Sequence, residues 1–484
     1  MLHRRLLLMA VAATLVVPSV PIATAAVVDG QRGACMPQQM PGGEWSTYGA
    51  DLPGTQDQRD EHVIGPGNVA SLQRQWITGN TGYQSPPPIV ADACVFINTN
   101  GHIEALNLAT GKLVWTSRGA DTTGTFAVTV VDGRVLVGLN NNGKPAAAAF
   151  DERDGRLLWV SKPIYFGYQA TQQSSAIVFR GLLALFTTGP EADPKSRDGY
   201  GLIDVTTGDV VYKSTVMPAK LQKQGFAGGG VWGTPTVDPA TGYLYVGTAN
   251  PGSKTKESVY DNAILKLDVD RQRRTFGQIV ATFKGSSDSA TGYDNPVCQS
   301  TGDTVWAQAK IYAGAPTCGQ TDVDFGVGPT LWRNSSGRLM GAALQKSGWL
   351  RAFYADTMKL AWAKQVFVSL GPLGGEMCRI ATDGKTLFAA ANPGVLYALR
   401  ASDGSVLWKA TLTGVPMKGG NVALANGVVY YVDEDALKAF DAKTGSLLWM
   451  SAPTPAASIG SGVAVAGHYV VANHYGEVAA YKLG

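Results

Sequence analysis

Short apolar stretches alternate with small-residue turns along almost the whole of this 484-residue chain. Each unit contains an apolar strand, such as VFIN, TLFAAA or VVYYV, and then an Ala-Leu or Ala-Phe step that leads into a Gly, Asp or Asn turn. The turn is followed by a short hydrophobic strand that ends most often in tryptophan, as in TGKLVW, DGSVLW and TGSLLW. Short strands repeated in this way predict four-stranded antiparallel blades around an axis.

The two ends of the repeat region complete each other. The segment LQRQWIT, which contains Trp76, has the last strand of a blade but no blade before it. The final segment, HYVVANHYGEVAAYKLG, has the inner strands of a blade and stops before the turn and tryptophan. Seven complete units and this divided one predict an all-β, eight-bladed β-propeller. It would be closed by pairing of the N- and C-terminal strands, which removes the open sheet edges.

The repeated aromatic residues are predicted to hold neighbouring blades together. A large aromatic side chain buries much apolar area, which suits packing between two sheets. The residues at this position are Trp76, Trp115, Trp159, Trp362, Trp408 and Trp449, with Tyr212 in the same place in another unit. These side chains are therefore assigned to the scaffold.

The N-terminus is typical of a secretory signal peptide. MLHRRLLLMAVAATLVV has a positive start and a short apolar run, and small residues follow up to Ala26. We expect cleavage near Ala26 and export to the periplasm or the extracellular space. The expected organisation is a signal peptide at 1–26, an N-terminal segment at 27–70 and a propeller at 71–484 with an insertion at 285–322. No later stretch approaches about eighteen uncharged apolar residues, so we expect no membrane span.

Composition and charge narrow the classes of partner. The chain is 45% hydrophobic and 16% charged and has 59 glycines, which suits a turn-rich all-β protein with a large core. Loss of Arg4 and Arg5 with the signal peptide would lower the formal net charge from +3 to +1. A chain with so little positive charge is poorly suited to a phosphate backbone, so nucleic acid is not an expected partner.

The five cysteines contain neither a C-x-x-C-H haem motif nor a C-x-x-C zinc pair. Cysteines of exported proteins usually form disulfides. Cys298 and Cys318 bracket the polar insertion and are the favoured pair, which would stabilise the fold by about 3 kcal/mol in the chain-entropy model. Cys35, Cys94 and Cys378 stay unassigned.

Trp232 lies outside the repeated tryptophan position. It stands in GFAGGGVWGTPTVDPATGYLYVGTANPG, where three glycines precede it and Asn250 ends the following strand. The glycines are expected to bring the backbone close to something flat, and the start of an inner strand lines the central channel. The alternative interpretation is an ordinary core aromatic at Trp232 and a turn residue at Asn250.

Four elements outside the repeat occur in a distinctive order. They are WSTYGADLPGTQDQRDEHVIGPGNVASLQRQW, VWGTPTVDPATGYLYVGTANP, TDVDFGVGP after Cys298 and Cys318, and LQKSGWLRAFYADT. Together they resemble the pyrroloquinoline quinone-dependent alcohol dehydrogenases, most closely the polyvinyl-alcohol dehydrogenase-like branch. The resemblance runs from about Trp45 to the C-terminus and implies the same propeller fold.

The resemblance implies residues that bind the quinone. Trp232 occupies the place of the tryptophan on which the quinone ring lies, where stacking would use the flat face of the indole. Lys346 matches the cation at the quinone carbonyl, where a positive charge would stabilise negative charge that develops during reduction. Thr188 falls where the family has a small hydroxyl side chain near the cofactor.

The resemblance also implies a calcium site. Its ligands would be Glu191, Asn250 and Asp324, which offer the oxygen atoms that calcium prefers. Gly326 stands where lanthanide-using relatives carry an extra carboxylate, which favours calcium. Asp324 is also the expected general base for the alcohol proton, and Asp322 is the alternative base.

One stretch departs from the family pattern. In LGGEMCRIATDGK, Cys378 and Arg379 replace a Trp-Gly pair and Glu376 is shifted by one position. The second blade also begins without the arginine that relatives use to hold a cofactor carboxylate. These changes are expected to loosen the lid and one anchor of the cofactor site.

Two functions are open at this point. The leading hypothesis is a secreted quinoprotein that uses calcium and oxidises small or polymeric alcohols, secondary alcohols among them. It would pass electrons to an external acceptor, such as a cytochrome or a quinone, because the chain has no haem motif. The alternative is a non-catalytic propeller scaffold that binds protein or polysaccharide.

Overall fold

The protein is seen here in a computed structural model. It describes residues 35–79, 87–123, 126–167, 169–190, 193–253, 256–285, 323–367, 378–391, 394–413, 420–433, 436–452, 462–474 and 476–484, all of which belong to one unit, Ala34–Gly484. The expected signal peptide, Glu191, Asp322 and the pair Cys298 and Cys318 lie outside the described residues. Helical structure within them is limited to the 3-10 turn η1 (Val69–Ser71) and the short helix α1 (Ala219–Lys223).

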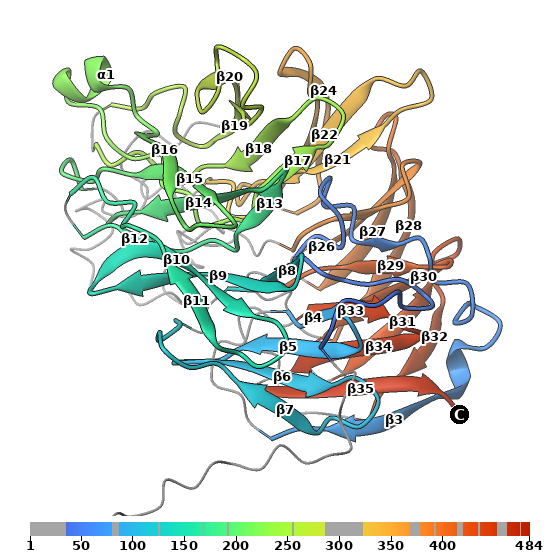
Figure 1. The fold of residues 1–484 in the computed structure, drawn as a ribbon. Coiled ribbons are helices and arrows are strands. Elements are labelled where there is room, and N and C mark those ends of the chain that lie inside the picture. Colours follow the sequence, from blue (N-terminus) through green and yellow to red (C-terminus); the bar gives the residue numbers. More distant parts are fainter. Residues whose placement is uncertain are drawn as a thin grey trace, which may run out of the picture. The chain divides into compact units, whose positions relative to one another are not determined.

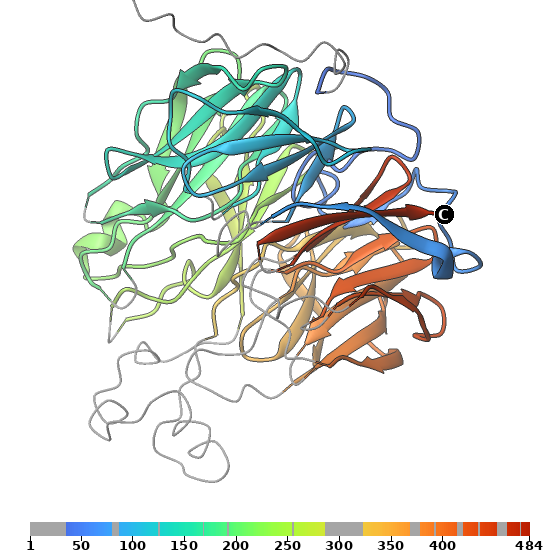
Figure 2. The same ribbon diagram turned by 90° about the horizontal axis from the view of Figure 1, so that it is seen from below.

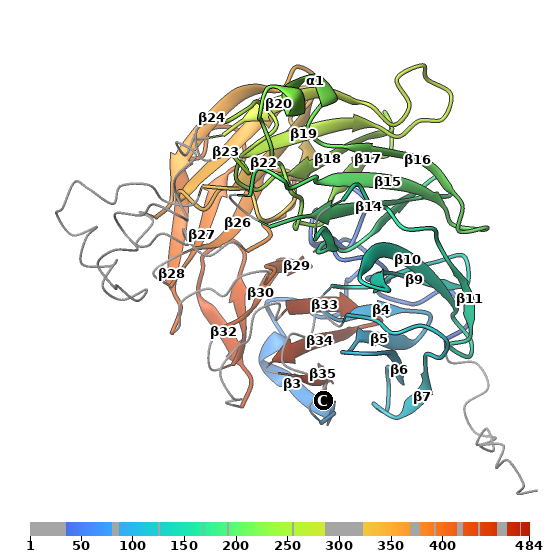
Figure 3. The same ribbon diagram turned by 90° about the vertical axis from the view of Figure 1, so that its left-hand side faces the viewer.

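The strands form eight antiparallel blades in an eight-bladed β-propeller, which confirms the predicted fold (Figures 1 and 3). The first four blades are β4 (Ile89–Ala91), β5 (Cys94–Asn98), β6 (Ile103–Asn107) and β7 (Leu113–Thr116); β8 (Thr129–Val131), β9 (Arg134–Asn141), β10 (Lys144–Asp151) and β11 (Leu157–Val160); β12 (Thr171–Gln172), β13 (Ile177–Phe179), β14 (Leu182–Thr188), β15 (Gly199–Asp204) and β16 (Val210–Thr215); and β17 (Thr236–Asp238), β18 (Tyr243–Gly247), β19 (Ala263–Asp268) and β20 (Ile279–Lys284).

The remaining four blades follow in chain order. They are β21 (Thr330–Arg333), β22 (Leu339–Leu344), β23 (Trp349–Tyr354) and β24 (Lys359–Gln365); β25 (Ala381–Thr382), β26 (Thr386–Ala391), β27 (Val395–Arg400) and β28 (Val406–Thr411); β29 (Ala423–Ala425), β30 (Val428–Val432), β31 (Leu437–Asp441) and β32 (Leu447–Met450), with β2 (Asp57–Gln58) added; and β33 (Gly462–Ala466), β34 (Tyr469–His474), β35 (Glu477–Leu483) and β3 (Leu72–Ile77).

The position of a strand in its blade explains its sequence. Second strands such as β5, β14 and β30 are buried along their whole length, since both faces meet other blades. The outermost strand β28 alternates half-buried and exposed residues, because one of its faces meets solvent. The apolar runs thus correspond to the second strands of the blades, and the tryptophan-ending segments correspond to the outermost strands.

Strand β3 closes the ring by pairing antiparallel with β35. Leu72 lies opposite Leu483 and Trp76 opposite Ala480. Figure 2 shows β3, in blue, beside the C-terminal strand, in red. The predicted completion of one blade from the two ends of the repeat region is therefore confirmed.

The repeated tryptophans connect each blade to the next. The indole N–H of Trp115 in β7 donates to the carbonyl of Glu152, which follows β10, at 2.7 Å. Gly155 (φ +70°) lies against the Trp115 ring, and a Cβ there would come within 2.5 Å of Cε3. Equivalent indole-to-carbonyl bonds, at 2.7–3.1 Å, are made by Trp76, Trp159, Trp362 and Trp408. The scaffold role predicted for these residues is confirmed.

The N-terminal segment crosses the inner strands of several blades. Its backbone carbonyls between Trp45 and Gln56 accept hydrogen bonds from the inner strands β4, β8, β17, β21, β25 and β29; the donors are Val90, Val130, Val237, Leu331, Thr382 and Leu424. Strand β2 continues this course by pairing parallel with β29. The segment is therefore built into the centre of the propeller.

A disulfide between Cys35 and Cys94 fixes the start of this segment to β5. The backbone N–H of Cys35 also donates to the carbonyl of Asp92, at 3.0 Å. These two cysteines had no assignment from the sequence.

Within the part of the chain that the structure describes, no helix is long and apolar enough to cross a bilayer.

Candidate active site

Backbone hydrogen bonds place the predicted site residues on adjoining segments. Trp232 precedes β17, and its loop bonds to the loop after β18 through Ala249 N–H and the carbonyl of Gly230, at 2.7 Å. That second loop, which carries Asn250, accepts from Phe325 N–H at the carbonyl of Thr248, at 3.1 Å. Lys346, in the turn between β22 and β23, donates its own N–H to the carbonyl of Asp324, at 3.1 Å. Two neighbouring blades, β17–β20 and β21–β24, therefore contribute to one region.

Asp324 lies at the centre of this region and is completely buried. Its Oδ2 accepts a hydrogen bond from the indole N–H of Trp232, at 2.8 Å. Its Oδ1 lies 2.8 Å from the ammonium of Lys346, whose side chain is 5% exposed. A buried carboxylate needs both charge compensation and hydrogen-bond donors, and these two side chains supply them. The three predicted residues form one contact cluster.

Lys346 also contacts the indole ring directly. Its ammonium nitrogen lies 4.7 Å from the centroid of the Trp232 ring, within the range of a cation–π interaction. Trp232 is only partly buried, whereas Thr188, Asn250, Asp324 and Lys346 are buried. The indole therefore combines an accessible surface with a positive charge and a carboxylate at its edge.

The glycines before Trp232 allow segments of the protein to approach one another. A Cβ on Gly230 would collide with the hydroxyl of Thr188, and one on Gly228 would come within 2.6 Å of the carbonyl oxygen of Asn250. That these glycines also approach something flat stays a prediction. Their close packing brings Thr188 and Asn250 to the segment that carries Trp232.

The oxygen-bearing residues fit a calcium ion by their chemistry. Asp324 and Asn250 provide a carboxylate and an amide carbonyl on two hydrogen-bonded segments, and calcium prefers such oxygens and accepts further ones from a bound ligand. Among the described residues, no group of three His, Cys, Asp or Glu side chains is placed to hold a metal ion. The third expected ligand, Glu191, is outside those residues.

Asp198 fixes the loop that leaves Thr188. Its carboxylate accepts hydrogen bonds from the backbone N–H of Gly189 and from the hydroxyl of Ser196, at 3.1 Å in the latter case. Burial raises the pKa of Asp198 to about 6, and the hydrogen bonds oppose that rise. The buried carboxyl group of Asp198 thus holds both ends of this loop through hydrogen bonds.

Arg379 is a buried residue whose role was missed from the sequence. Its guanidinium donates to the carbonyl oxygens of Thr234, at 3.1 Å, and Pro329, at 3.3 Å. Thr234 and Pro329 belong to the segments that carry Trp232 and Asp324. A lone arginine between Cys378 and the apolar start of β25 was the available signal, because a charge in that setting has to find buried partners.

Comparison with known protein families gives one match over most of the chain. A family model described as outer membrane protein assembly factor BamB matches residues 66–291 and 300–484. Among curated proteins, the polyvinylalcohol dehydrogenase of Sphingopyxis sp. (strain 113P3) is 26% identical over 406 residues, which are 75% of this chain and 58% of that protein. The polyvinylalcohol dehydrogenase of a Pseudomonas species is 25% identical over 416 residues, covering 78% and 61%. The chain thus spans about three fifths of the length of these relatives.

Solved structures share the fold at low sequence identity. The quinohemoprotein alcohol dehydrogenase of Comamonas testosteroni has a TM-score of 0.69 and 16% identity, over 91% of this chain and 80% of that one. BamB of Moraxella catarrhalis has a TM-score of 0.56 and 14% identity, over 85% and 99%. Propellers of this architecture therefore occur both among alcohol dehydrogenases and in an assembly factor.

Proposed function

We propose that this chain, which belongs to the family described as outer membrane protein assembly factor BamB and to the pyrroloquinoline quinone-dependent alcohol dehydrogenases, is a secreted quinoprotein that oxidises alcohols. Secondary and polymeric alcohols are the proposed substrates, because its similarity to the two polyvinylalcohol dehydrogenases covers three quarters of the chain or more. The observation that carries the proposal is the cluster of Trp232, Asp324 and Lys346, in which a partly exposed indole meets a buried ion pair.

Trp232 and Lys346 are proposed to bind the quinone. The partly exposed indole offers a flat surface for stacking. The Lys346 ammonium, 4.7 Å from the ring centroid, is near enough to approach a carbonyl of a ring stacked there. Thr188, packed against Gly230, supplies a hydroxyl at the side of the same segment.

Asp324 is proposed as the general base. Its carboxylate has a cation on one oxygen and an N–H donor on the other, so it is held in one orientation and its negative charge is stabilised. It would accept the hydroxyl proton of the alcohol as the carbon–hydrogen bond breaks.

Glu191, Asn250 and Asp324 would hold a calcium ion. Pyrroloquinoline quinone held at Trp232 and Lys346 would supply the hydride acceptor and calcium a Lewis acid, and the proposed external electron acceptor is a cytochrome or a quinone.

The second candidate function is a non-catalytic scaffold for protein or polysaccharide. The observation that favours it is the match to the assembly-factor family model and the structural likeness to BamB. A scaffold has no need for a buried Asp324–Lys346 pair beside a partly exposed indole. Burial of two charges also occurs at Lys438 and Asp433, so it is the contact of the Asp324–Lys346 pair with a partly exposed indole that favours the enzyme.

Dye reduction tests this proposal. The purified protein is incubated with pyrroloquinoline quinone and calcium and then offered a panel of primary, secondary and polymeric alcohols with an artificial electron acceptor. Alcohol-dependent reduction that Asp324→Asn removes supports the enzyme. A folded protein that binds a polysaccharide or a partner protein and reduces no dye with any alcohol supports the scaffold.

A further inference from the structure

Arg379 connects the two segments that carry the proposed quinone platform and the proposed base. The backbone carbonyl of Thr234, which it binds through Nη1, lies two positions after Trp232. The carbonyl of Pro329, which it binds through Nη2, lies five positions after Asp324. Gly328 makes the same junction tight, because a Cβ there would collide with the carbonyl of Thr234. One guanidinium thus links two backbones that meet at the Trp232–Asp324 hydrogen bond.

The other side of the guanidinium is covered by the N-terminal segment. The carbon Cζ of Arg379 lies 5.4 Å from the centroid of the Tyr48 ring. Gly54, in the left-handed region at φ +68°, lies against Nη2, and a Cβ at this position would collide with it. The carbonyl of Pro53 accepts a hydrogen bond from Leu331 N–H at 2.9 Å. The N-terminal segment therefore packs against the guanidinium that binds the two site-bearing segments.

The electrostatic setting keeps Arg379 positively charged. Burial lowers the pKa of its guanidinium to about 10, while the nearby Tyr48 and Asp51 oppose the shift. The residue is 1% exposed, so its charge is balanced by carbonyl oxygens and by Asp51 rather than by water. Removal of such a group would leave two buried carbonyls without these donors, which is costly. The carbonyls of Thr234 and Pro329 therefore receive these hydrogen bonds from a charged donor that water does not reach.

We propose that Arg379 is a positioning residue that fixes the separation of the Trp232 and Asp324 segments and thereby aligns the quinone platform with the base. The proposal rests on the proposed function for its catalytic meaning, but the alignment itself is a property of the protein alone. A planar bidentate donor suits this task, because it binds two carbonyls in fixed directions, whereas an ammonium is a single point charge. Displacement of a catalytic group by about 1 Å is sufficient to slow a reaction about a hundredfold.

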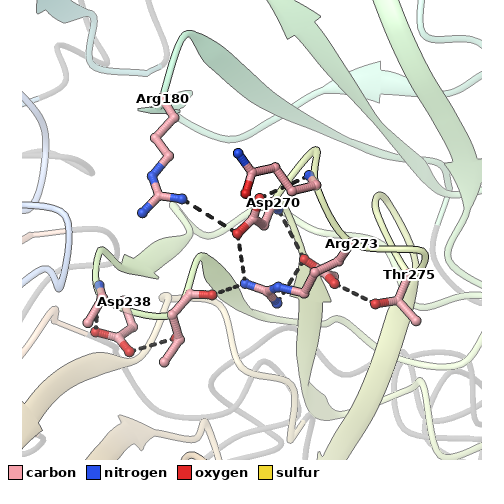
Figure 4. Close-up of polar contacts among 9 residues, drawn as sticks. Arg180, Asp238, Asp270, Arg273 and Thr275 are labelled. Carbon is pink, nitrogen blue, oxygen red and sulfur yellow. Dashed lines mark hydrogen bonds and ion pairs between the residues drawn. The ribbon is translucent and has the colours of Figure 1, made fainter.

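The test compares Arg379→Met and Arg379→Lys with the control Arg273→Met. Arg273 belongs to an ion cluster with Asp268, at 3.0 Å, and Asp270, at 3.3 Å, and also bonds to the Thr241 carbonyl (Figure 4). This cluster holds the turn between β19 and β20 and contains none of the proposed site residues. The control therefore removes a structural arginine from the neighbouring scaffold.

The first measurement needs no cofactor. Amide hydrogen exchange is followed in peptides that cover 228–237 and 323–331. Arg379→Met is expected to raise exchange in both peptides, Arg379→Lys in part, and Arg273→Met chiefly in 238–242 and 268–278. Unchanged exchange in 228–237 and 323–331 on loss of the Arg379 guanidinium would overturn the positioning role.

The second measurement is quinone binding and turnover in the presence of calcium. Arg379→Met is expected to weaken quinone binding about tenfold and to lower kcat more than it raises KM for the alcohol. Arg379→Lys should recover part of this loss, and Arg273→Met should leave both quantities within about twofold of the wild type. Equal quinone affinity and kcat in Arg379→Met and the wild type would overturn the proposal.

Two further outcomes separate this inference from the proposed function. If the wild type binds no quinone but Arg379→Met still raises exchange in both peptides, the proposed function fails and the positioning role stands. If Arg379→Met does not fold, Gly54→Ala replaces it, because the added methyl would displace the guanidinium without removing its charge. Unchanged exchange in 228–237 and 323–331 in Gly54→Ala would count against the positioning role.

Discussion

The indole N–H of Trp232 donates to Oδ2 of Asp324 at 2.8 Å, although the two residues are 92 positions apart. This bond makes the proposed platform and the proposed base a single unit. Lys346 adds a positive charge that touches both the carboxylate and the ring. Each of the three residues therefore has separate consequences when it is replaced.

Asp324→Asn is expected to lower alcohol turnover at least about a hundredfold. The amide keeps the size of the side chain and an oxygen for the Trp232 N–H, but it cannot accept a proton. Steady-state dye reduction with quinone and calcium measures the loss. Asp322→Asn is the matched control, since Asp322 is the alternative base; activity lost in Asp322→Asn and kept in Asp324→Asn would reverse the assignment.

Lys346→Met should weaken quinone binding and also destabilise the fold, because it leaves the buried Asp324 carboxylate without its cation. Breaking a buried pair in this way costs about 3 to 5 kcal/mol. Chemical denaturation measures the stability and calorimetry the quinone affinity.

A second buried pair provides the control for Lys346. The ammonium of Lys438 lies 2.7 Å from Asp433, and the two side chains are 6% and 1% exposed. Lys438→Met should lose a similar amount of stability while quinone affinity is retained. Equal losses of affinity in Lys438→Met and Lys346→Met would mean that the effect is one of stability alone.

Trp232→Phe is expected to keep a flat ring but to lose the N–H donor to Asp324. Quinone affinity should fall by less than about tenfold, while kcat should fall further because the carboxylate loses its orienting bond. Trp408→Phe removes the bond to the Ala442 carbonyl at 3.0 Å and serves as the scaffold control. It should lower the melting temperature without changing kcat. A kcat in Trp232→Phe equal to that of the wild type would argue against this orienting bond.

Glu152 should make stability depend on pH. Burial raises the pKa of its carboxyl group from 4.5 to about 9, with further contributions from Asp92, Glu44 and Asp151. The folded state thus holds this proton more tightly than the unfolded state. Its contribution to the free energy of unfolding is complete below pH 4.5 and is lost as the pH rises toward about 9.

Glu152→Gln tests this linkage, because the amide has the same shape and does not titrate. The free energy of unfolding, measured by denaturant between pH 5 and pH 9, should fall less steeply with rising pH in the variant than in the wild type. Parallel curves for the two proteins would show that Glu152 titrates normally in the folded state.

Local pattern was sufficient to predict the blades and their closure. The half-blade that ends at Trp76 and the incomplete one at the C-terminus identified the pairing of β3 with β35, because a hydrogen-bonding edge has to be satisfied. The tryptophans could be separated into scaffold residues and Trp232 by their place relative to the turn. The strands and turns of each unit are local in sequence, and the closure could be inferred because each end of the repeat region is an incomplete unit.

Contacts between distant segments that leave no incomplete repeat in the sequence were not predicted. The pairing of Cys35 with Cys94 follows from the route of the N-terminal segment, and spacing alone does not determine disulfide connectivity. Arg379 was interpreted as a loss from the family pattern, whereas it binds the carbonyls of Thr234 and Pro329. The family resemblance supplied the site residues, but the direct bonds among Trp232, Asp324 and Lys346 became visible only in three dimensions.

The most direct test of the account is a calorimetric titration of the folded protein with pyrroloquinoline quinone, with and without calcium. We predict saturable binding of one quinone per chain, and this binding should need calcium. Trp232→Ala should weaken the binding by at least about tenfold, and Lys438→Met should leave it intact. Absence of binding to the folded wild type under these conditions, or equal binding by Trp232→Ala, would contradict the claim that this cluster is a quinone site.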